Sequence, residues 1–328
     1  MPGSSELGPT DKANPLRGYL LALLAALCWA TGGLTAKWLF TTPSTATASW
    51  PVVPLGITIE PTTLSGARAL CAFVLLAVVL AVGRPRDLRI SLKDVPFLAV
   101  FGVFGLALVH YTYFKTISLT NVATAILLEY LAPVIVLLIG VAFMKHKFTW
   151  WLPLGVALSI GGSALVVGAI GGDGLVVSPE GIGWGLLSAV FFAAYSLMGT
   201  VAATRFSPYT ALVWGLGFAS LFWLVVLKPA VVLSAFADPK AAMAIVFIAV
   251  VSTIVPFSAF LIALHHIAPT NATVTSTVEP VIAGVGAYLL FGESLSAIQI
   301  LGGAMVVAAI AVVQLPERSP APTLPRQD

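Results

Sequence analysis

Charged residues are scarce in this chain of 328 residues. Only 9% of the residues are Asp, Glu, Lys or Arg, whereas soluble domains carry about 25%. Hydrophobic residues make up 59% of the chain and the mean hydropathy is +1.02, so apolar side chains cannot all be confined to a core. The shortage of charge excludes an ordinary soluble enzyme and predicts an integral membrane protein whose main solvent is lipid.

Motifs for nucleotide, metal and hydrolytic chemistry are also missing. The sequence has no G-x-x-x-x-G-K-[ST], which excludes a self-contained ATP-driven pump, and no H-E-x-x-H or G-x-S-x-G. The two cysteines, Cys28 and Cys71, fall in apolar runs and are typical of small buried hydrophobic residues. The 16 basic residues are scattered and form no nucleic-acid footprint. We therefore expect no metal, no cofactor and no nucleic-acid partner.

Long apolar runs supply enough length for ten membrane crossings. One helical crossing needs about 20 mainly apolar residues. The segment Thr41–Glu60, rich in Thr, Pro and Ser, is the longest connection and is expected either to form an extracellular flap or to lie partly in the membrane interface. The sequence predicts an all-α integral membrane fold with ten transmembrane helices near residues 17–40, 62–83, 95–117, 120–143, 150–170, 181–203, 209–229, 241–264, 269–291 and 295–315.

The distribution of Lys and Arg between the loops predicts the orientation, because cytoplasmic loops are enriched in both. With both termini inside, the cytoplasmic side would hold Lys12, Arg17, Arg84, Arg86, Arg89, Lys93, Lys145, Lys147, Arg205, Arg318 and Arg326. The outside would hold Lys37, Lys115, Lys228 and Lys240. We therefore expect a multi-pass protein of the cell membrane (plasma or inner membrane), with cytoplasmic tails at residues 1–16 and 316–328.

The two halves of the chain resemble each other. Pro133-Val134-Ile135 matches Pro280-Val281-Ile282 at an offset of 147 residues, and Gly155 matches Gly302 at the same offset. A repeat of five spans contains an odd number of crossings, so the second copy must enter the membrane in the opposite orientation. Inverted repeats of this kind are typical of secondary transporters, whose substrate site lies at the repeat interface near the membrane midplane.

The repeat boundaries follow from the predicted spans. The first repeat is expected at residues 17–170 and the second at 181–315. Glu129 and Glu279 match at an offset of 150, three residues away from the main alignment. These two acidic residues are therefore expected at similar depths but not at equivalent alignment positions.

Three segments resemble a known transporter family. Tyr113–Thr149 is similar to the fourth-helix region of the EamA branch of the drug/metabolite transporter superfamily. Val278–Ser296, with E-P-V and a terminal G-E-x-L-[ST], is similar to the ninth-helix region. Leu64–Phe73 resembles the second helix, with Arg68 at its basic position, and Trp29 falls where the first helix often carries such a residue. The resemblance implies a ten-helix, inverted five-plus-five transporter with a central cavity and a small-molecule substrate.

Two glutamates lie inside predicted spans. Glu129 is about nine residues into its span and Glu279 about ten, roughly 14 and 15 Å at 1.5 Å per residue, which is near the middle of a hydrocarbon core about 30 Å thick. A charge at the helix centre costs about 2.5–3.5 kcal/mol on insertion scales and so indicates function. Either carboxylate is a candidate to carry a coupling proton or to hold a substrate ammonium group. The alternative is a structural ion pair with Arg68 or Lys115.

Polar residues accompany both glutamates. Asn271, Thr275 and Glu279 recur every four residues, and Asn121 and Glu129 repeat part of that pattern. Residues four apart share one face of a helix, so this spacing predicts a polar stripe facing a water-filled cavity.

Further candidates for the cavity are a histidine and several aromatic residues. Tyr130 gives Glu129 a second polar neighbour, and Tyr113 lies in the third predicted span beside His110. His110 either titrates or makes an interhelical hydrogen bond. Trp29 and Tyr195 are candidate wall residues that would stack on a substrate or on its ammonium group.

A proline follows each glutamate: Pro133 comes four residues after Glu129, and Pro280 directly after Glu279. Pro133 and Pro280 each lack the backbone N–H that a helix interior needs. The sequence predicts a kink at each position, and a gating hinge is the alternative interpretation.

These features favour a secondary transporter that exports small metabolites such as amino acids by alternating access. Proton coupling, uncoupled facilitative exchange and uptake remain alternatives. A polytopic enzyme or a receptor is less well supported, because no catalytic motif and no large soluble region is present. A monomer is expected, since both halves of the inverted repeat lie in one chain.

Overall fold

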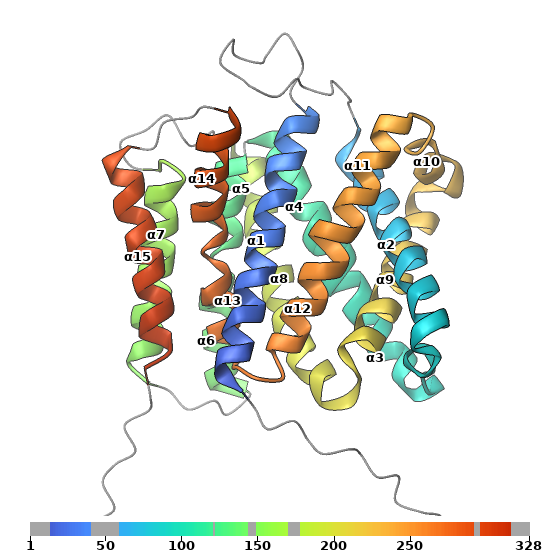
Figure 1. Cartoon of the computed structure of the whole chain (residues 1–328), viewed down its shortest axis with the longest axis horizontal. Helices are drawn as coiled ribbons and strands as arrows, with labels where there is room; N and C mark the ends of the chain where they lie inside the picture. Colours follow the sequence, from blue (N-terminus) through green and yellow to red (C-terminus); the bar gives the residue numbers. More distant parts are fainter. Residues whose placement is uncertain are drawn as a thin grey trace, which may run out of the picture.

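The fold was analysed in a computed structural model, which describes residues 14–40, 59–120, 122–143, 149–169, 178–291 and 296–315. Throughout these ranges the regular secondary structure is helical and no strand occurs (Figure 1). The predicted all-α class is therefore confirmed. Most of the long connection Thr41–Glu60, and Asn121 of the predicted polar pattern, lie outside the described residues.

The described residues of the first half form seven α-helices. A π-helical segment, η3 (Phe101–Ala107), joins α3 to α4 without interruption, and two short 3₁₀ turns, η1 (Pro85–Leu88) and η2 (Leu92–Asp94), precede α3. The α-helices are α1 (Pro15–Phe40), α2 (Pro61–Gly83), α3 (Val95–Val100), α4 (Leu108–Leu119), α5 (Val122–Glu129), α6 (Ala132–Phe143) and α7 (Trp151–Val166).

The second half follows a similar pattern. A second π-helical segment, η4 (Val250–Ile254), joins α11 to α12 as η3 joins α3 to α4. The α-helices are α8 (Pro179–Arg205), α9 (Pro208–Leu227), α10 (Pro229–Ser234), α11 (Pro239–Ala249), α12 (Val255–Ala263), α13 (Pro269–Ser276), α14 (Glu279–Phe291) and α15 (Ala297–Val313).

Local sequence explains where many of these helices begin. Proline stands in the first turn of α2, α8, α9, α11 and α13, where its missing N–H costs nothing. Ser178, Ser207, Asp238 and Ser296 each accept a backbone N–H as N-caps of the following helices. The helix starts are therefore encoded locally, even though the surrounding sequence is almost uniformly apolar.

Within the described ranges, seven helical segments are long and apolar enough to cross a membrane. They are Pro15–Thr35, Pro61–Gly83, Leu92–Leu119, Thr124–Phe143, Pro179–Arg205, Pro208–Leu227 and Pro239–Ala263. Helices α7 and α15 are apolar but have only 16 and 17 residues. The predicted span at 269–291 is divided into α13 and α14. The chain thus has the helices of a multi-pass membrane protein, and the ten-span arrangement remains a prediction.

Two helices are interrupted at the positions where proline predicted kinks. Helix α5 ends at Glu129 and α6 begins at Ala132, one residue before Pro133. Helix α13 ends at Ser276 and α14 begins at Glu279, one residue before Pro280. Since proline cannot donate to the carbonyl four residues earlier, each proline leaves one carbonyl at its break without the usual helical partner.

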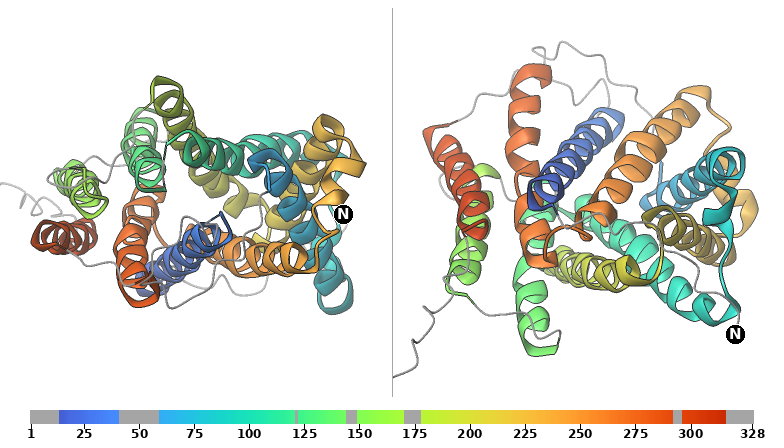
Figure 2. Two further views of the ribbon diagram at one scale, coloured as in Figure 1. Left: turned by 90° about the horizontal axis from the view of Figure 1, so that it is seen from above. Right: turned by 60° about the horizontal axis from the view of Figure 1, so that its bottom comes forward.

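Helices from opposite halves of the chain pack closely against each other. Figure 1 shows α7 and α15 side by side at one edge of the molecule, and both views in Figure 2 keep them together. Extensive contacts also join α2 to α9, α4 to α8, and α1 to α12. The halves are therefore interleaved, and the space between them lies near the middle of the molecule.

Close approach of α7 and α15 depends on two facing glycines. A Cβ atom added to Gly162 would lie 2.7 Å from the carbonyl oxygen of Gly302, and one added to Gly302 would lie 2.6 Å from the carbonyl oxygen of Gly162. Gly155 meets the same neighbouring helix at Val313 and Ala309. Small residues at such a contact let two backbones approach, which is how helices commonly associate in lipid.

We expect Gly162→Ala to destabilise the protein. The new methyl group would press on the backbone of α15, and overpacking typically costs about 1–3 kcal/mol. Gly161→Ala is the matched control, because its Cβ would meet only the flexible end of Met305, at 3.3 Å. Thermal unfolding of both purified variants in detergent measures the difference. Equal unfolding midpoints for the two variants would contradict the proposed contact.

Candidate functional site

A cavity of about 680 Å³, including its mouth, lies between the two halves of the chain. Its wall combines residues from α1, α2, α4 and α5 of the first half with residues from α8, α11, η4, α12 and α14 of the second. The lining residues are Trp29, Gly32, Gly33, Arg68, Val109, His110, Tyr113, Phe114, Glu129, Phe192, Ile248, Ser252, Phe257 and Glu279.

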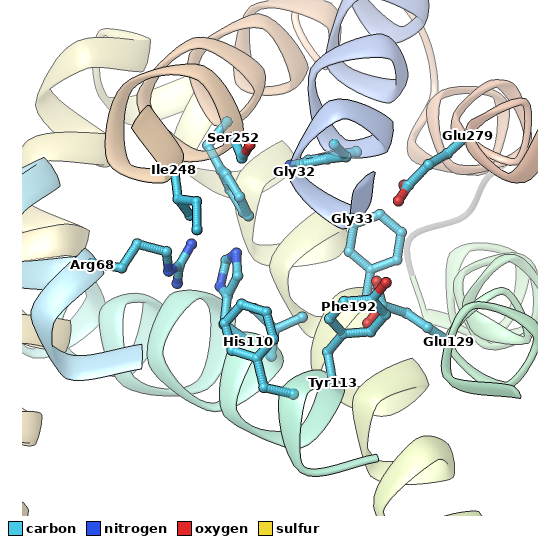
Figure 3. A pocket seen from close by; sticks show the side chains of 14 residues that line it. Gly32, Gly33, Arg68, His110, Tyr113, Glu129, Phe192, Ile248, Ser252 and Glu279 are labelled. Carbon is cyan, nitrogen blue, oxygen red and sulfur yellow. The ribbon is translucent and has the colours of Figure 1, made fainter. Parts of the chain in front are cut away.

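Opposite charges occupy opposite ends of this cavity. Figure 3 shows Arg68 and His110 at one end and the carboxyl groups of Glu129 and Glu279 at the other. The side chains of Tyr113 and Phe192 lie between the two ends. The cavity is therefore bipolar, with a cation at one end and two acidic groups at the other.

Each glutamate of the acidic end is held by a hydroxyl group. The Ser188 hydroxyl on α8 donates to the Glu129 carboxylate. The Tyr130 hydroxyl lies 2.5 Å from Oε2 of Glu279 and donates to it. No ion pair joins either glutamate to Arg68 or Lys115 in the part of the chain that the structure describes. The ion-pair interpretation of these carboxylates is therefore not the arrangement found.

The cationic end is built on α2 and on the π-helical segment of the other half. Arg68 is only 2% exposed, and its Nη1 donates to Oγ1 of Thr253 at 2.9 Å. The Thr253 hydroxyl in turn donates to the carbonyl of Ile248, five residues earlier, at 3.0 Å. The π-helical turn thus orients the group that holds the guanidinium.

His110 stands beside Arg68 on α4. Its Nδ1 lies 2.9 Å from the carbonyl oxygen of Leu106, so Nδ1 carries a hydrogen and donates to that carbonyl. The ring also packs against Phe257, with centroids 5.0 Å apart. The backbone therefore fixes Nδ1 of His110, and this bond does not involve Nε2.

Aromatic side chains form one wall of the cavity. The Trp29 ring meets Phe192 at a centroid distance of 5.7 Å and Phe257 at 5.3 Å, both edge to face. Such a wall offers apolar surface together with ring faces that attract cations.

Three polar atoms of lining residues lack a hydrogen-bond partner within the described residues. They are Nε of Arg68, the hydroxyl of Tyr113 and the hydroxyl of Ser252. A buried polar group without a partner is costly, and native proteins keep few of them. Polar atoms of Ser163, Trp223, Ser258 and Asn271, away from the cavity lining, share this property, so it is the position of these three in the cavity wall that makes them candidates to bind a ligand.

Some predicted residues lie outside the cavity lining. Nδ2 of Asn271 donates to Tyr19 at 2.8 Å and to the carbonyl of Val313 at 3.1 Å, so it ties α13 to α1 and α15. Thr275 is fully buried and donates to the carbonyl of Asn271. The break after Ser276 separates both residues from Glu279, so the predicted single polar stripe is wrong.

Tyr130 and Tyr195 also lie behind the cavity wall. Tyr130 is 3% exposed and touches the cavity through Glu279. Tyr195 is fully buried, donates to the carbonyl of Phe257 at 3.2 Å, and packs on Phe192. Tyr195 therefore supports the wall from behind.

Sequence reasoning missed several lining residues. Ser252 belongs to a polar Ser-Thr pair in an otherwise apolar run, a signal that could have located it. Phe192 and Phe257 carry no such signal among 18 phenylalanines. Gly33 lines the cavity through its missing side chain, with no atom within 4 Å of an added Cβ.

Comparison with known proteins agrees with a membrane transporter. An uncharacterized transporter of Archaeoglobus fulgidus is 29% identical over 223 residues, covering 66% of this chain and 74% of its own. A probable terminal-alkyne amino-acid exporter of Streptantibioticus cattleyicolor is 26% identical over 258 residues, covering 76% and 82%. The threonine/homoserine exporter RhtA of Escherichia coli K12 is 25% identical over 245 residues, covering 74% and 79%.

Two further matches concern the fold and the family. A solved crystal structure superposes with a TM-score of 0.70 at 19% identity, covering 90% of this chain and 96% of its own, which shows a shared fold. The profile of the EamA-like transporter family matches residues 16–168 and again residues 179–315. Because these two matches take in most of the sequence, the chain belongs to the EamA-like transporter family and is a membrane transporter.

Proposed function

We propose that this transporter exports small zwitterionic metabolites, amino acids in particular, through the bipolar cavity. The observation that carries the proposal is the placement of Arg68 at one end of the cavity and of Glu129 and Glu279 at the other (Figure 3). An amino acid carries a carboxylate and an ammonium group on one carbon. A cavity with a cation at one end and carboxylates at the other matches both groups.

Each end of the cavity has suitable hydrogen-bonding chemistry. The guanidinium of Arg68 donates through Nη1 to Thr253, and its unpartnered Nε is available to a substrate carboxylate. Within the described residues, Glu129 and Glu279 each accept one side-chain hydroxyl, which leaves acceptor capacity for an ammonium group. The ring of Trp29 would add cation–π attraction on the same substrate group.

The named relatives support the same substrate class. Two relatives are named as exporters of amino acids, one for terminal-alkyne amino acids and one for threonine and homoserine. The proposed direction, export, rests on the names of these relatives. The proposed substrate class, amino acids, rests both on those names and on the charged residues at the two ends of the cavity.

The proposed architecture is ten crossings in an inverted five-plus-five repeat, with repeats at residues 17–170 and 181–315. In this scheme α3–η3–α4 and α11–η4–α12 are equivalent crossings, and each contains a π-helical segment. The broken pairs α5–α6 and α13–α14 are equivalent as well. The helix contacts support this equivalence. Helix α4 packs on α8, the first helix of the second repeat, and its equivalent α12 packs on α1, the first helix of the first repeat. The equivalent helices α7 and α15 pack on each other, and so do α2 and α9.

We propose alternating access between the two repeats as the transport mechanism. The cavity lies between the repeats, so rocking one against the other would expose its ends in turn. The protein would act as a monomer in the plasma or inner membrane with both termini cytoplasmic, as the Lys and Arg distribution predicts.

A proton is proposed as the coupling ion. Glu129 and Glu279 both line the same end of the cavity, where one site brings two carboxyl groups that can carry a proton together (Figure 3). Substrate ammonium and proton would then compete for the same carboxylates, which is the requirement for antiport.

Reconstituted transport tests the proposed function. We expect proteoliposomes with an imposed proton gradient and a trapped pH dye to lose protons faster when a transported amino acid is added. Protein-free vesicles are the control. A pool of labelled amino acids that shows neither proton-linked movement nor counterflow would reject the proposal. Counterflow without proton movement would reject the coupling alone.

We expect Arg68→Gln to weaken amino-acid transport. Loss of a charged hydrogen bond to the substrate carboxylate should raise the apparent KM by at least about tenfold. The decarboxylated amine of the same substrate should be transported equally by the wild type and the variant. Arg84→Gln is the control, because Arg84 lies over the ring of Tyr209 outside the cavity. An unchanged preference for the amino acid over its amine in Arg68→Gln would contradict the assignment.

We expect Glu129→Gln to reduce flux about tenfold or more while membrane insertion stays intact. The amide keeps the size of the side chain and can still contact Ser188, but it has no charge for an ammonium group. Initial rates in proteoliposomes, normalised to the amount of inserted protein, measure the effect. Wild-type flux in this variant would remove Glu129 from the site.

A further inference from the structure

Tyr130 connects the two helix breaks. It lies between α5 and α6, at the break of the first half, and its hydroxyl reaches the break between α13 and α14. There it lies 3.0 Å from the carbonyl oxygen of Ser276 and 2.5 Å from the Glu279 carboxylate. One side chain from the first half thus contacts both a backbone atom and an acidic group at the break in the second half.

The Ser276 carbonyl needs a partner because of Pro280. In an uninterrupted helix this carbonyl would accept the N–H four residues later, and residue 280 is a proline without an N–H. Ser276 is fully buried, so water does not reach the carbonyl through the surface. The Tyr130 hydroxyl supplies the donor that Pro280 lacks.

A hydroxyl group has only one hydrogen to donate. When Glu279 is ionised, both groups on Tyr130 are acceptors, and the hydrogen goes to the stronger, charged acceptor. The Ser276 carbonyl then loses its donor. When Glu279 takes up a proton from water in the cavity, the carboxyl group itself donates to the Tyr130 oxygen, and Tyr130 can donate to Ser276.

We infer that Tyr130 is a positioning residue that makes the hydrogen bonding of the α13–α14 break depend on the proton of Glu279. The protonated site has a complete chain of donors from Glu279 through Tyr130 to Ser276. The ionised site leaves one buried carbonyl unpaired, which favours movement at the break. The use of this exchange in transport rests on the proposed function, whereas the exchange itself does not.

Other groups near Glu279 set the charge around this exchange. Glu129 faces it from α5 and Tyr113 from α4. Arg68 and His110 face it across the cavity (Figure 3). None of these four residues has a recorded hydrogen bond to Glu279 within the described residues, whereas Tyr130 lies within hydrogen-bond distance of both Glu279 and the backbone of the break.

Hydrogen exchange across α13 and α14 tests the inference on the purified full-length protein. In Glu279→Gln the amide nitrogen donates to the Tyr130 oxygen, as the protonated acid would. Amides around the break should therefore exchange roughly threefold to tenfold more slowly in this variant than in the wild type at alkaline pH, once intrinsic rates are corrected. Adding Tyr130→Phe to Glu279→Gln should remove that protection.

A matched tyrosine separates this role from a merely structural one. Tyr195→Phe also deletes a fully buried hydroxyl that donates to a backbone carbonyl, but one without a carboxylate beside it. It should leave the difference between wild type and Glu279→Gln unchanged. If Tyr130→Phe alters exchange at the break by the same factor in both backgrounds, or not at all, the inference is overturned.

The wild type alone supplies a second test should Tyr130→Phe not fold. Corrected exchange at the break should rise with pH in the wild type and stay constant in Glu279→Gln. Exchange that is independent of pH in the wild type would overturn the inference. If the effects of Tyr130→Phe and Glu279→Gln on hydrogen exchange are non-additive but the protein transports no amino acid, the proposed function alone is rejected. If the protein transports amino acids but the two effects on exchange are additive, the role of Tyr130 alone is rejected.

Discussion

Lipid supplies no hydrogen-bond partners, so a polar group in the membrane interior depends on the protein, or on a cavity, for its partner. This constraint accounts for the arrangement around the cavity. Arg68 hydrogen-bonds to Thr253, Glu129 to Ser188 and Glu279 to Tyr130, and in each pair one residue comes from the first half of the chain and the other from the second. These bonds cross between the two halves of the chain, so the same contacts that make the charges tolerable also hold the halves around the cavity.

The constraint also explains the two kinds of helix irregularity. A π-helical turn in η4 places Thr253 so that its hydroxyl bonds back to Ile248 while it accepts from Arg68. A proline break in α13–α14 leaves the Ser276 carbonyl for a side chain to satisfy. Irregular backbone is tolerated at membrane depth where it lines a cavity or is buried in protein. Both irregularities occur beside the cavity, where they create hydrogen-bonding positions that a regular helix lacks.

Sequence reasoning located the charged ends of the site but not its wall. Glu129, Glu279 and Arg68 stand out because charge is so rare in apolar runs. Phe192 and Phe257 do not, since phenylalanine is ordinary in a membrane helix. The four-residue spacing of Asn271, Thr275 and Glu279 would place them on one face only in a continuous helix. The helix is broken between Ser276 and Glu279, and Pro280 predicted the interruption without giving the direction of the helix that follows.

The repeat symmetry makes the position of Tyr130 informative. At the offset of 147 residues, Thr277 is the counterpart of Tyr130, and Glu129 is the counterpart of Ser276. The Thr277 hydroxyl bonds to the carbonyl of Val274 within its own helix, at 2.6 Å, and a threonine is too short to reach across as a tyrosine does. A hydroxyl of the first half therefore reaches the free backbone carbonyl at the break of the second half, whereas the second half reaches the break of the first half at a carboxylate, through Ser188 and Glu129. The family profile matches both halves, yet the groups that meet at the two breaks differ: a tyrosine hydroxyl meets a backbone carbonyl at one, and a serine hydroxyl meets a carboxylate at the other. The chemistry of each break is therefore set by the individual side chains and not by the repeat alone.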